Sequence, residues 1–76
     1  MKVVLYCDDS VQSEAARQFL NGHGIGFEEV DVRTSAGFER MLKRTQQRQI
    51  PVFELKRSHS IGIVVDLESL AKELGL

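Results

Sequence analysis

The stretch LYCDDSVQSEAARQFL, residues 5–20, predicts how the chain begins to fold. It continues the β-branched apolar run of residues 2–6, which is typical of a strand buried on both faces of a sheet. After a short acidic turn, Ser10 is a suitable N-cap, and a glycine-rich NGHG segment ends the helix that follows. Apolar residues recur in that helix at helical spacing, at Val11, Ala15, Ala16, Phe19 and Leu20.

Three further strands are expected, at residues 25–32, 49–55 and 60–65. The second should run parallel to the first, because a helix separates them, and the fourth should return antiparallel to the third through the polar turn 56–59. The only proline, Pro51, lies in the third strand, where its missing amide hydrogen indicates a sheet edge or a turn.

Two more helices complete the chain. Thr34 or Ser35 can cap the first of them, and Asp66 can cap the second. One face of the first is apolar and the other is expected to point to water, with Arg40, Lys43 and Arg44 on it. The order β-α-β-α-β-β-α predicts an α/β fold in a single domain, residues 1–76, with a four-stranded mixed sheet and flanking helices.

Composition narrows the function classes. The net charge is −1, and acidic and basic residues are interspersed, so we expect no nucleic acid as a partner. The one local cluster of basic residues consists of Lys43, Arg44 and Arg48. No apolar run approaches the roughly 18 residues of a membrane span, and no signal peptide is recognisable, so we expect a cytoplasmic protein without membrane contact. Its two histidines, His23 and His59, have no metal-ligand spacing. We expect no metal, no permanently bound cofactor, and a monomer or weak dimer.

Four local sequences, in matching order, resemble glutaredoxins of the thioredoxin-fold superfamily. Residues 10–20 have the spacing of the family's C-x-x-C helix, with Ser10 and Ser13 at both cysteine positions. GIGFEEVDV (24–32) is similar to the second strand, RQIP (48–51) to the cis-proline segment, and IGIVVDLESL (61–70) to the last strand and turn. The resemblance implies a minimal thioredoxin fold, a cis bond before Pro51, and glutathione or a protein thiol as partner.

The chain departs from the glutaredoxin pattern where thiol chemistry is concerned. Dithiol exchange needs a thiolate at the helix start and a second cysteine one turn later, and Ser10 and Ser13 supply neither. The family's glycine pair is Gly62 followed by Ile63 here. We therefore expect weak or no dithiol oxidoreductase activity. Ser10 also matches the position of the catalytic serine in some glutathione transferases, but we do not expect the second, helical domain that forms their second-substrate site.

Cys7, the only cysteine, has two interpretations. In C7-D-D-S10 it has the spacing of a monothiol glutaredoxin, which would make it the catalytic thiol. Alternatively, it is a small buried residue at the end of a strand, because cysteine is among the most often buried residue types. The neighbouring Asp8 and Asp9 should raise the pKa of its thiol.

The resemblance also implies a ligand groove beside Pro51. Arg48 would be the cation beside a ligand carboxylate, and Asp66 would recognise a γ-glutamyl amine in addition to capping its helix. The expected ligand-binding residues are Tyr6, Arg48, Ile50, Pro51, Gly62 and Asp66. Three functions stay open: binding of glutathione, another thiol or an extended peptide in this groove; monothiol oxidoreduction through Cys7; and a non-enzymatic interaction module.

Overall fold

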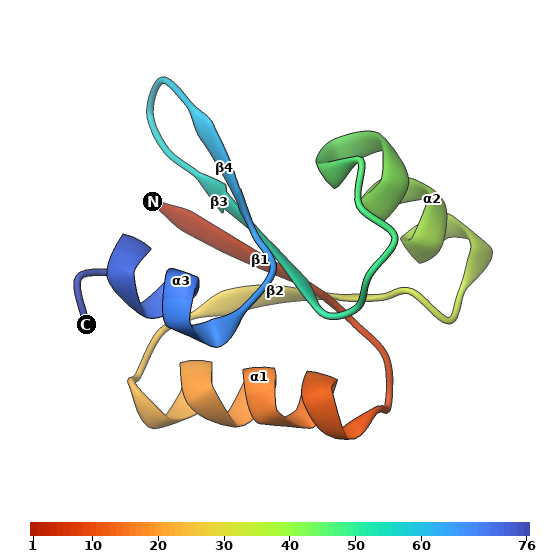
Figure 1. Cartoon of the computed structure of the whole chain (residues 1–76). Coiled ribbons are helices and arrows are strands. Elements are labelled where there is room, and N and C mark those ends of the chain that lie inside the picture. The colour runs from red at the N-terminus through yellow and green to blue at the C-terminus, as the bar shows by residue number, and fades with distance from the viewer.

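The computed structural model describes residues 1–76, and Figure 1 shows the chain. It confirms the predicted β-α-β-α-β-β-α order and the α/β fold class. The elements are β1 (Lys2–Cys7), α1 (Val11–Gly22), β2 (Phe27–Asp31), α2 (Ser35–Thr45), β3 (Val52–Lys56), β4 (Ile61–Val64) and α3 (Leu67–Glu73). None of the three helices has the length and apolar character that a membrane span requires.

The four strands form one mixed sheet in the order β2-β1-β3-β4. β1 pairs in parallel with β2 and antiparallel with β3, and β4 pairs antiparallel with β3. Of the two alternatives for Pro51, a sheet edge or a turn, the structure has the turn, because β3 lies between β1 and β4. Pro51 precedes the first residue of β3 and lies in a bend. Its missing amide hydrogen therefore costs the sheet no ladder hydrogen bond.

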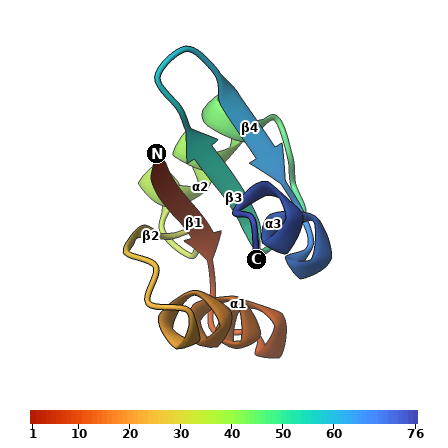
Figure 2. The same cartoon turned by 90° about the vertical axis from the view of Figure 1, so that its left-hand side faces the viewer.

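A hydrophobic core lies on each face of the sheet. Figures 1 and 2 show α1 and α3 on one face and α2 on the other. Alternate side chains of a strand point to opposite faces, so β1 and β3 contribute to both cores. The α1 and α3 face contains Val3, Leu5, Cys7, Ala16, Leu20, Phe53, Leu55, Val64 and Leu70. The α2 face contains Val4, Tyr6, Val30, Val32, Met41 and Val52.

The three helices begin at the expected residues. Ser10, Thr34 and Asp66 are the N-caps, and each side chain accepts a hydrogen bond from a backbone amide three residues later. Such a cap stabilises a helix by about 1 kcal/mol. The caps of α1 and α3 fix the turns that follow β1 and β4. These two turns, together with the bend before β3, meet at one end of the molecule.

The polar face of α2 differs from its prediction. Lys43 is exposed as expected, with Glu39 one helical turn away at 3.4 Å. Arg44 instead reaches back to the sheet, where Nη2 lies 3.2 Å from Oε2 of the buried Glu54. Arg40 pairs with Glu28 of β2 at 2.7 Å. Two of the three basic residues therefore attach the helix to the sheet rather than facing only water.

Candidate functional site

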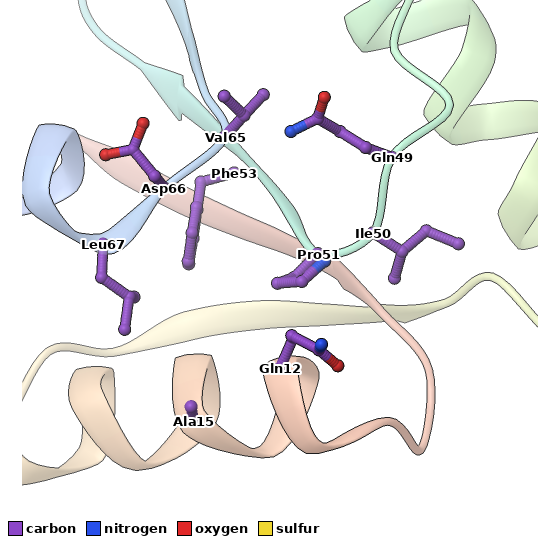
Figure 3. A pocket seen from close by; sticks show the side chains of 9 residues that line it. All are labelled: Gln12, Ala15, Gln49, Ile50, Pro51, Phe53, Val65, Asp66 and Leu67. Atoms are coloured by element: carbon purple, nitrogen blue, oxygen red, sulfur yellow. The ribbon is translucent and has the colours of Figure 1, made fainter.

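A pocket of about 290 Å³ lies where three separate segments meet. Figure 3 shows its walls: the first turns of α1, the bend that leads into β3, and the turn from β4 into α3. Two of these segments are helix starts and the third is a strand start, so the backbone at each is fixed by neighbouring secondary structure. The lining residues are Gln12, Ala15, Gln49, Ile50, Pro51, Phe53, Val65, Asp66 and Leu67.

The pocket combines apolar walls with a few polar groups. Aliphatic and aromatic side chains form most of the lining, while Gln12, Gln49 and Asp66 provide the polar side chains. The amides can both donate and accept hydrogen bonds, and a carboxylate can accept from a cation. Hydrogen bonding from the backbone amide of Ser69, 2.7 Å from Oδ1, lowers the pKa of the Asp66 carboxyl. The site therefore offers a negative charge beside an apolar surface.

Three of the six expected ligand-binding residues are brought together in this pocket, namely Ile50, Pro51 and Asp66. The peptide bond between Ile50 and Pro51 is cis. The side chain of Arg48 is exposed and does not line the pocket. Tyr6 and Gly62 also lie outside it.

Tyr6 requires a correction. Its side chain is fully buried on the α2 face, where the hydroxyl donates a hydrogen bond to Oε1 of Glu54 at 2.6 Å. Burial, with the Glu54 contact, raises the pKa of Tyr6 to about 12. The residue contacts the protein interior instead of a ligand, because its polar atom is already satisfied inside the fold.

Gly62 lies on β4, outside the pocket. The guanidinium of Arg57 lies over it, so that Nη1 would be 2.7 Å from a Cβ at this position. Arg57 in turn donates to Glu73 of α3 at 3.1 Å. The space over Gly62 is thus occupied by the side chain of an arginine of the same chain.

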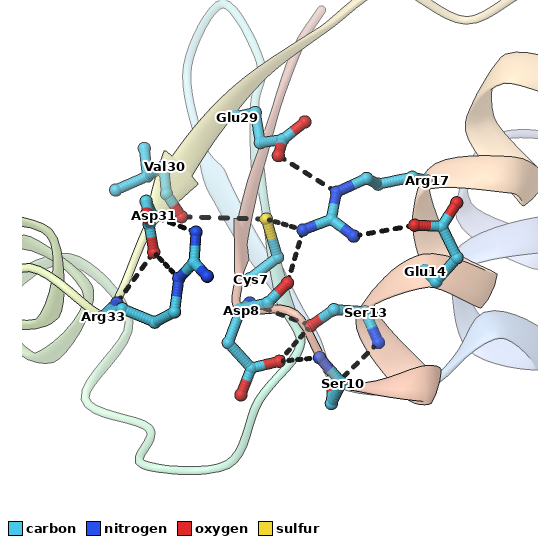
Figure 4. Close-up of polar contacts among 10 residues, drawn as sticks. All are labelled: Cys7, Asp8, Ser10, Ser13, Glu14, Arg17, Glu29, Val30, Asp31 and Arg33. Carbon is cyan, nitrogen blue, oxygen red and sulfur yellow. Dashed lines mark hydrogen bonds and ion pairs between the residues drawn. The ribbon is translucent and has the colours of Figure 1, made fainter.

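The two serines at the expected cysteine positions form hydrogen bonds within the turn after β1 (Figure 4). Ser13 is buried; its hydroxyl donates to Oδ1 of Asp8 at 2.8 Å and accepts from the amide of Asp8 at 3.0 Å. The amide of Ser10 donates to the same Oδ1 at 2.9 Å. Hydrogen bonds from Ser10 and then Ser13 lower the pKa of the Asp8 carboxyl. Neither hydroxyl contacts a histidine, and the Asp8 carboxylate that accepts from Ser13 is a weak base because its pKa is lowered, so neither serine has the strong base that a serine nucleophile needs.

Cys7 is buried in the core beneath α1. Its Sγ lies 3.8 Å from the carbonyl oxygen of Val30, and Arg17 donates to the sulfur at 3.5 Å (Figure 4). Burial first, and then the carboxylate of Glu29, raise the pKa of the thiol to about 11, and Arg17 offsets this only in part. The pKa of Cys7 is raised, as expected, but the carboxylate that contributes is that of Glu29 rather than that of Asp8 or Asp9. A buried, protonated thiol favours the structural interpretation of Cys7.

Sequence reasoning missed most of the pocket lining. Gln12 stands between Ser10 and Ser13, at a variable position of the C-x-x-C spacing, and Gln49 directly precedes the residues that were identified. Their positions beside recognised motifs were the available signal. Val65 and Leu67 flank Asp66 in the same way. The structure has no group of three or more histidine, cysteine or acidic side chains that could hold a metal.

The chain matches a known protein family. A family model described as Glutaredoxin matches residues 5–59, which is more than half of the chain. The matched part contains Ser10, Ser13 and the Ile50–Pro51 bond, and it ends before Asp66. A search of curated proteins found no match.

Proposed function

The chain belongs to the glutaredoxin family, and on this premise we propose that it binds a thiol peptide in the pocket beside Pro51 with weak or no dithiol oxidoreductase activity. Glutathione is a small ligand of this class, and an extended segment of a protein thiol offers similar backbone groups. The ligand is a transient partner rather than a bound cofactor. We further propose that residues 1–76 act as one domain in the cytoplasm, where a free thiol such as Cys7 stays reduced.

The lining of the pocket is the observation that carries the binding proposal. Pro51, Phe53 and Leu67 present an apolar surface, which suits the methylene groups of a small peptide. Gln12 and Gln49 can exchange hydrogen bonds with its amide groups. The carboxylate of Asp66 can accept from a ligand ammonium group, which a γ-glutamyl residue carries.

The expected weakness of dithiol exchange follows from the residues at the start of α1. A hydroxyl does not form an anion at neutral pH without a strong base, and the hydroxyls of Ser10 and Ser13 are engaged within the turn. Cys7 does not replace them, since its thiol is buried and holds its proton. Binding therefore remains while the exchange chemistry is lost.

Isothermal titration calorimetry with reduced glutathione tests the proposal. Asp66→Asn keeps the helix cap, because asparagine caps as well as aspartate, but removes the charge. We expect it to weaken binding about tenfold, which corresponds to about 1.4 kcal/mol. Glu68→Gln removes a charge two residues away, outside the pocket, and should leave the affinity unchanged.

Activity is measured separately, as glutathione-dependent reduction of a small disulfide. The expected rate is close to the rate without protein. No heat of binding in the calorimeter, or equal weakening by both variants, would reject the binding site. A rate well above background that disappears in Cys7→Ser would reject the assignment of Cys7 as structural.

A further inference from the structure

The two sides of the sheet differ in charge. Side chains alternate along a strand, and Val3 and Leu55 belong to the core on the α1 and α3 face. Their neighbours Lys2 and Lys56 therefore lie on the α2 face. With the basic residues of α2 they form what we call the basic surface, namely Lys2, Arg40, Lys43, Arg44 and Lys56. The α2 face thus holds five of the ten basic residues of the chain but only three of its eleven acidic residues.

These three acidic residues are already paired with cations of the basic surface. The pairs are Glu28 with Lys2 and Arg40, Glu39 with Lys43, and Glu54 with Arg44. Glu54 is fully buried, so it presents no negative charge to the solvent. Lys56 forms no ion pair within the chain, and the side chain of Lys43 remains 74% exposed. The surface therefore has cations available to a negatively charged partner.

The basic surface continues from α2 onto the part of the sheet that the helix leaves open. A hollow of about 280 Å³ lies on the outer side of α2 and has Arg40 in its lining. Glu28 connects this helix with β1, because it contacts both Arg40 and Lys2. The strand register then aligns Lys2, Lys56 and Ile61 across β1, β3 and β4. Figure 1 shows the start of β1 and the hairpin between β3 and β4 extending beyond α2.

An exposed apolar side chain belongs to the same surface. Ile63 packs against the core on the α2 face, and Ile61 points to the same side because it lies two residues away on β4. Ile61 is 55% exposed although it is large and apolar, and it lies directly opposite Lys56. Protein interfaces combine an apolar centre with a polar rim. The surface therefore suits a partner that has both acidic and apolar side chains.

We propose that the basic surface binds an acidic amphipathic segment of another protein. Carboxylates of this segment pair with Lys43 and Lys56, and an apolar side chain of the segment packs on Ile61. Charge complementarity of this kind speeds association and selects among partners, and salt screens it. The pocket beside Pro51 takes no part in this contact, so the proposal is independent of the thiol-peptide ligand.

The residues of this surface favour a protein segment over a polymer or membrane of phosphates. Glu39 stands on the outer side of α2 with its side chain 67% exposed, where it would repel a continuous phosphate surface. Tyr6 is buried and Phe38 packs against the core, so this side offers no free aromatic ring on which a base could stack. Ile61, in contrast, is suited to an apolar side chain.

Fluorescence anisotropy of a labelled peptide of Glu-Glu-Leu repeats tests the proposal on the whole chain. Lys43→Gln/Lys56→Gln removes one paired and one unpaired cation of the basic surface and should weaken binding about fivefold. Arg33→Gln/Lys72→Gln is the matched control, because it also removes one paired and one unpaired cation, both outside the basic surface. This control should bind the peptide like the wild type. Added salt should weaken binding to the wild type.

The apolar part of the contact is tested with Ile61→Ser and a peptide of Glu-Glu-Ser repeats. The wild type should prefer the leucine peptide, and Ile61→Ser should lose most of this preference. No binding of the leucine peptide, or equal weakening by the two double variants, would overturn the proposal. Tighter binding of a single-stranded oligonucleotide or of anionic lipid vesicles than of the leucine peptide would overturn it in favour of a phosphate partner.

Discussion

The hydroxyl of Tyr6 on β1 donates a hydrogen bond of 2.6 Å to Oε1 of Glu54 on β3, and both side chains are completely buried. The second oxygen of Glu54 has no aligned hydrogen-bond donor, but it lies 3.2 Å from Nη2 of Arg44 on α2. Arg40, on the same helix, lies 5.8 Å from the centre of the Tyr6 ring. A polar contact inside the core thus connects α2 with two neighbouring strands.

Tyr6→Phe should destabilise the protein by about 2 kcal/mol, because it removes the donor and leaves a buried carboxylate oxygen unsatisfied. Combining Tyr6→Phe with Glu54→Leu removes both partners. The combined loss should be smaller than the sum of the two single losses, as measured by urea unfolding. Additive losses would mean that the hydrogen bond contributes no coupling energy.

Gly37 in the first turn of α2 tests the contact between that helix and the end of β2. A Cβ there would lie 2.8 Å from the carbonyl carbon of Asp31 and overlap its oxygen, and backbone atoms cannot easily move aside. Gly37→Ala should therefore cost about 3 kcal/mol or more. Gly22→Ala has no atom within 4 Å of the new Cβ and should be stabilising by up to about 1 kcal/mol. Equal effects in thermal unfolding would contradict this packing.

The buried thiol of Cys7 should make stability fall at alkaline pH. Its pKa is raised from 9.0 to about 11, so the folded state holds the proton more tightly than the unfolded chain. This contribution is fully present below pH 9.0 and is lost as the pH rises through about 11, and it amounts to about 2–3 kcal/mol. The pKa of Tyr6 is also raised, so Tyr6 contributes to the pH dependence of stability in a similar range. Urea unfolding of the wild type and of Cys7→Ala across this pH range separates the contribution of the thiol from that of Tyr6. A Cys7→Ala variant with the same pH profile as the wild type would refute the raised pKa.

Installing the missing thiols should create activity. In Ser10→Cys/Ser13→Cys the first thiol lies at the start of α1, where the helix dipole favours a thiolate, so disulfide reduction should exceed that of the wild type. Adding Asp8→Asn should raise the rate again, because the carboxylate that now contacts both serines would disfavour the thiolate. Ser58→Cys/Ser60→Cys, in the hairpin, is the dithiol control. A rate no higher than this control's would contradict the account of the site.

The fold could be predicted because the local signals agree with one another. The apolar run of β1, the caps at Ser10 and Asp66, and the turn before β4 each specify one element, and their order leaves few arrangements. The start of β3 was placed too early because the apolar pattern does not distinguish the bend at Ile50 and Pro51 from the strand that follows.

The site was predicted less completely, because side-chain burial depends on tertiary contacts. Nothing in the local sequence shows that the hydroxyl of Tyr6 points at Glu54, or that Arg57 lies over Gly62. Tyr6 and Glu54 are 48 residues apart in the sequence, and Arg57 meets Gly62 across the hairpin that joins β3 and β4. Pro51 and Asp66 were identified by resemblance, whereas Gln12 enters the pocket only when α1 packs beside the bend.

The central claim is that the pocket beside Pro51 binds a thiol peptide. The most direct test is a titration of the ¹⁵N-labelled protein with reduced glutathione, followed by the backbone amide signals. Signals of Gln12, Ile50 and Asp66 should shift together with one saturation curve, while those of β2 and the 56–59 hairpin stay unchanged. Unchanged spectra at millimolar glutathione, or shifts confined to residues outside the pocket, would contradict the claim.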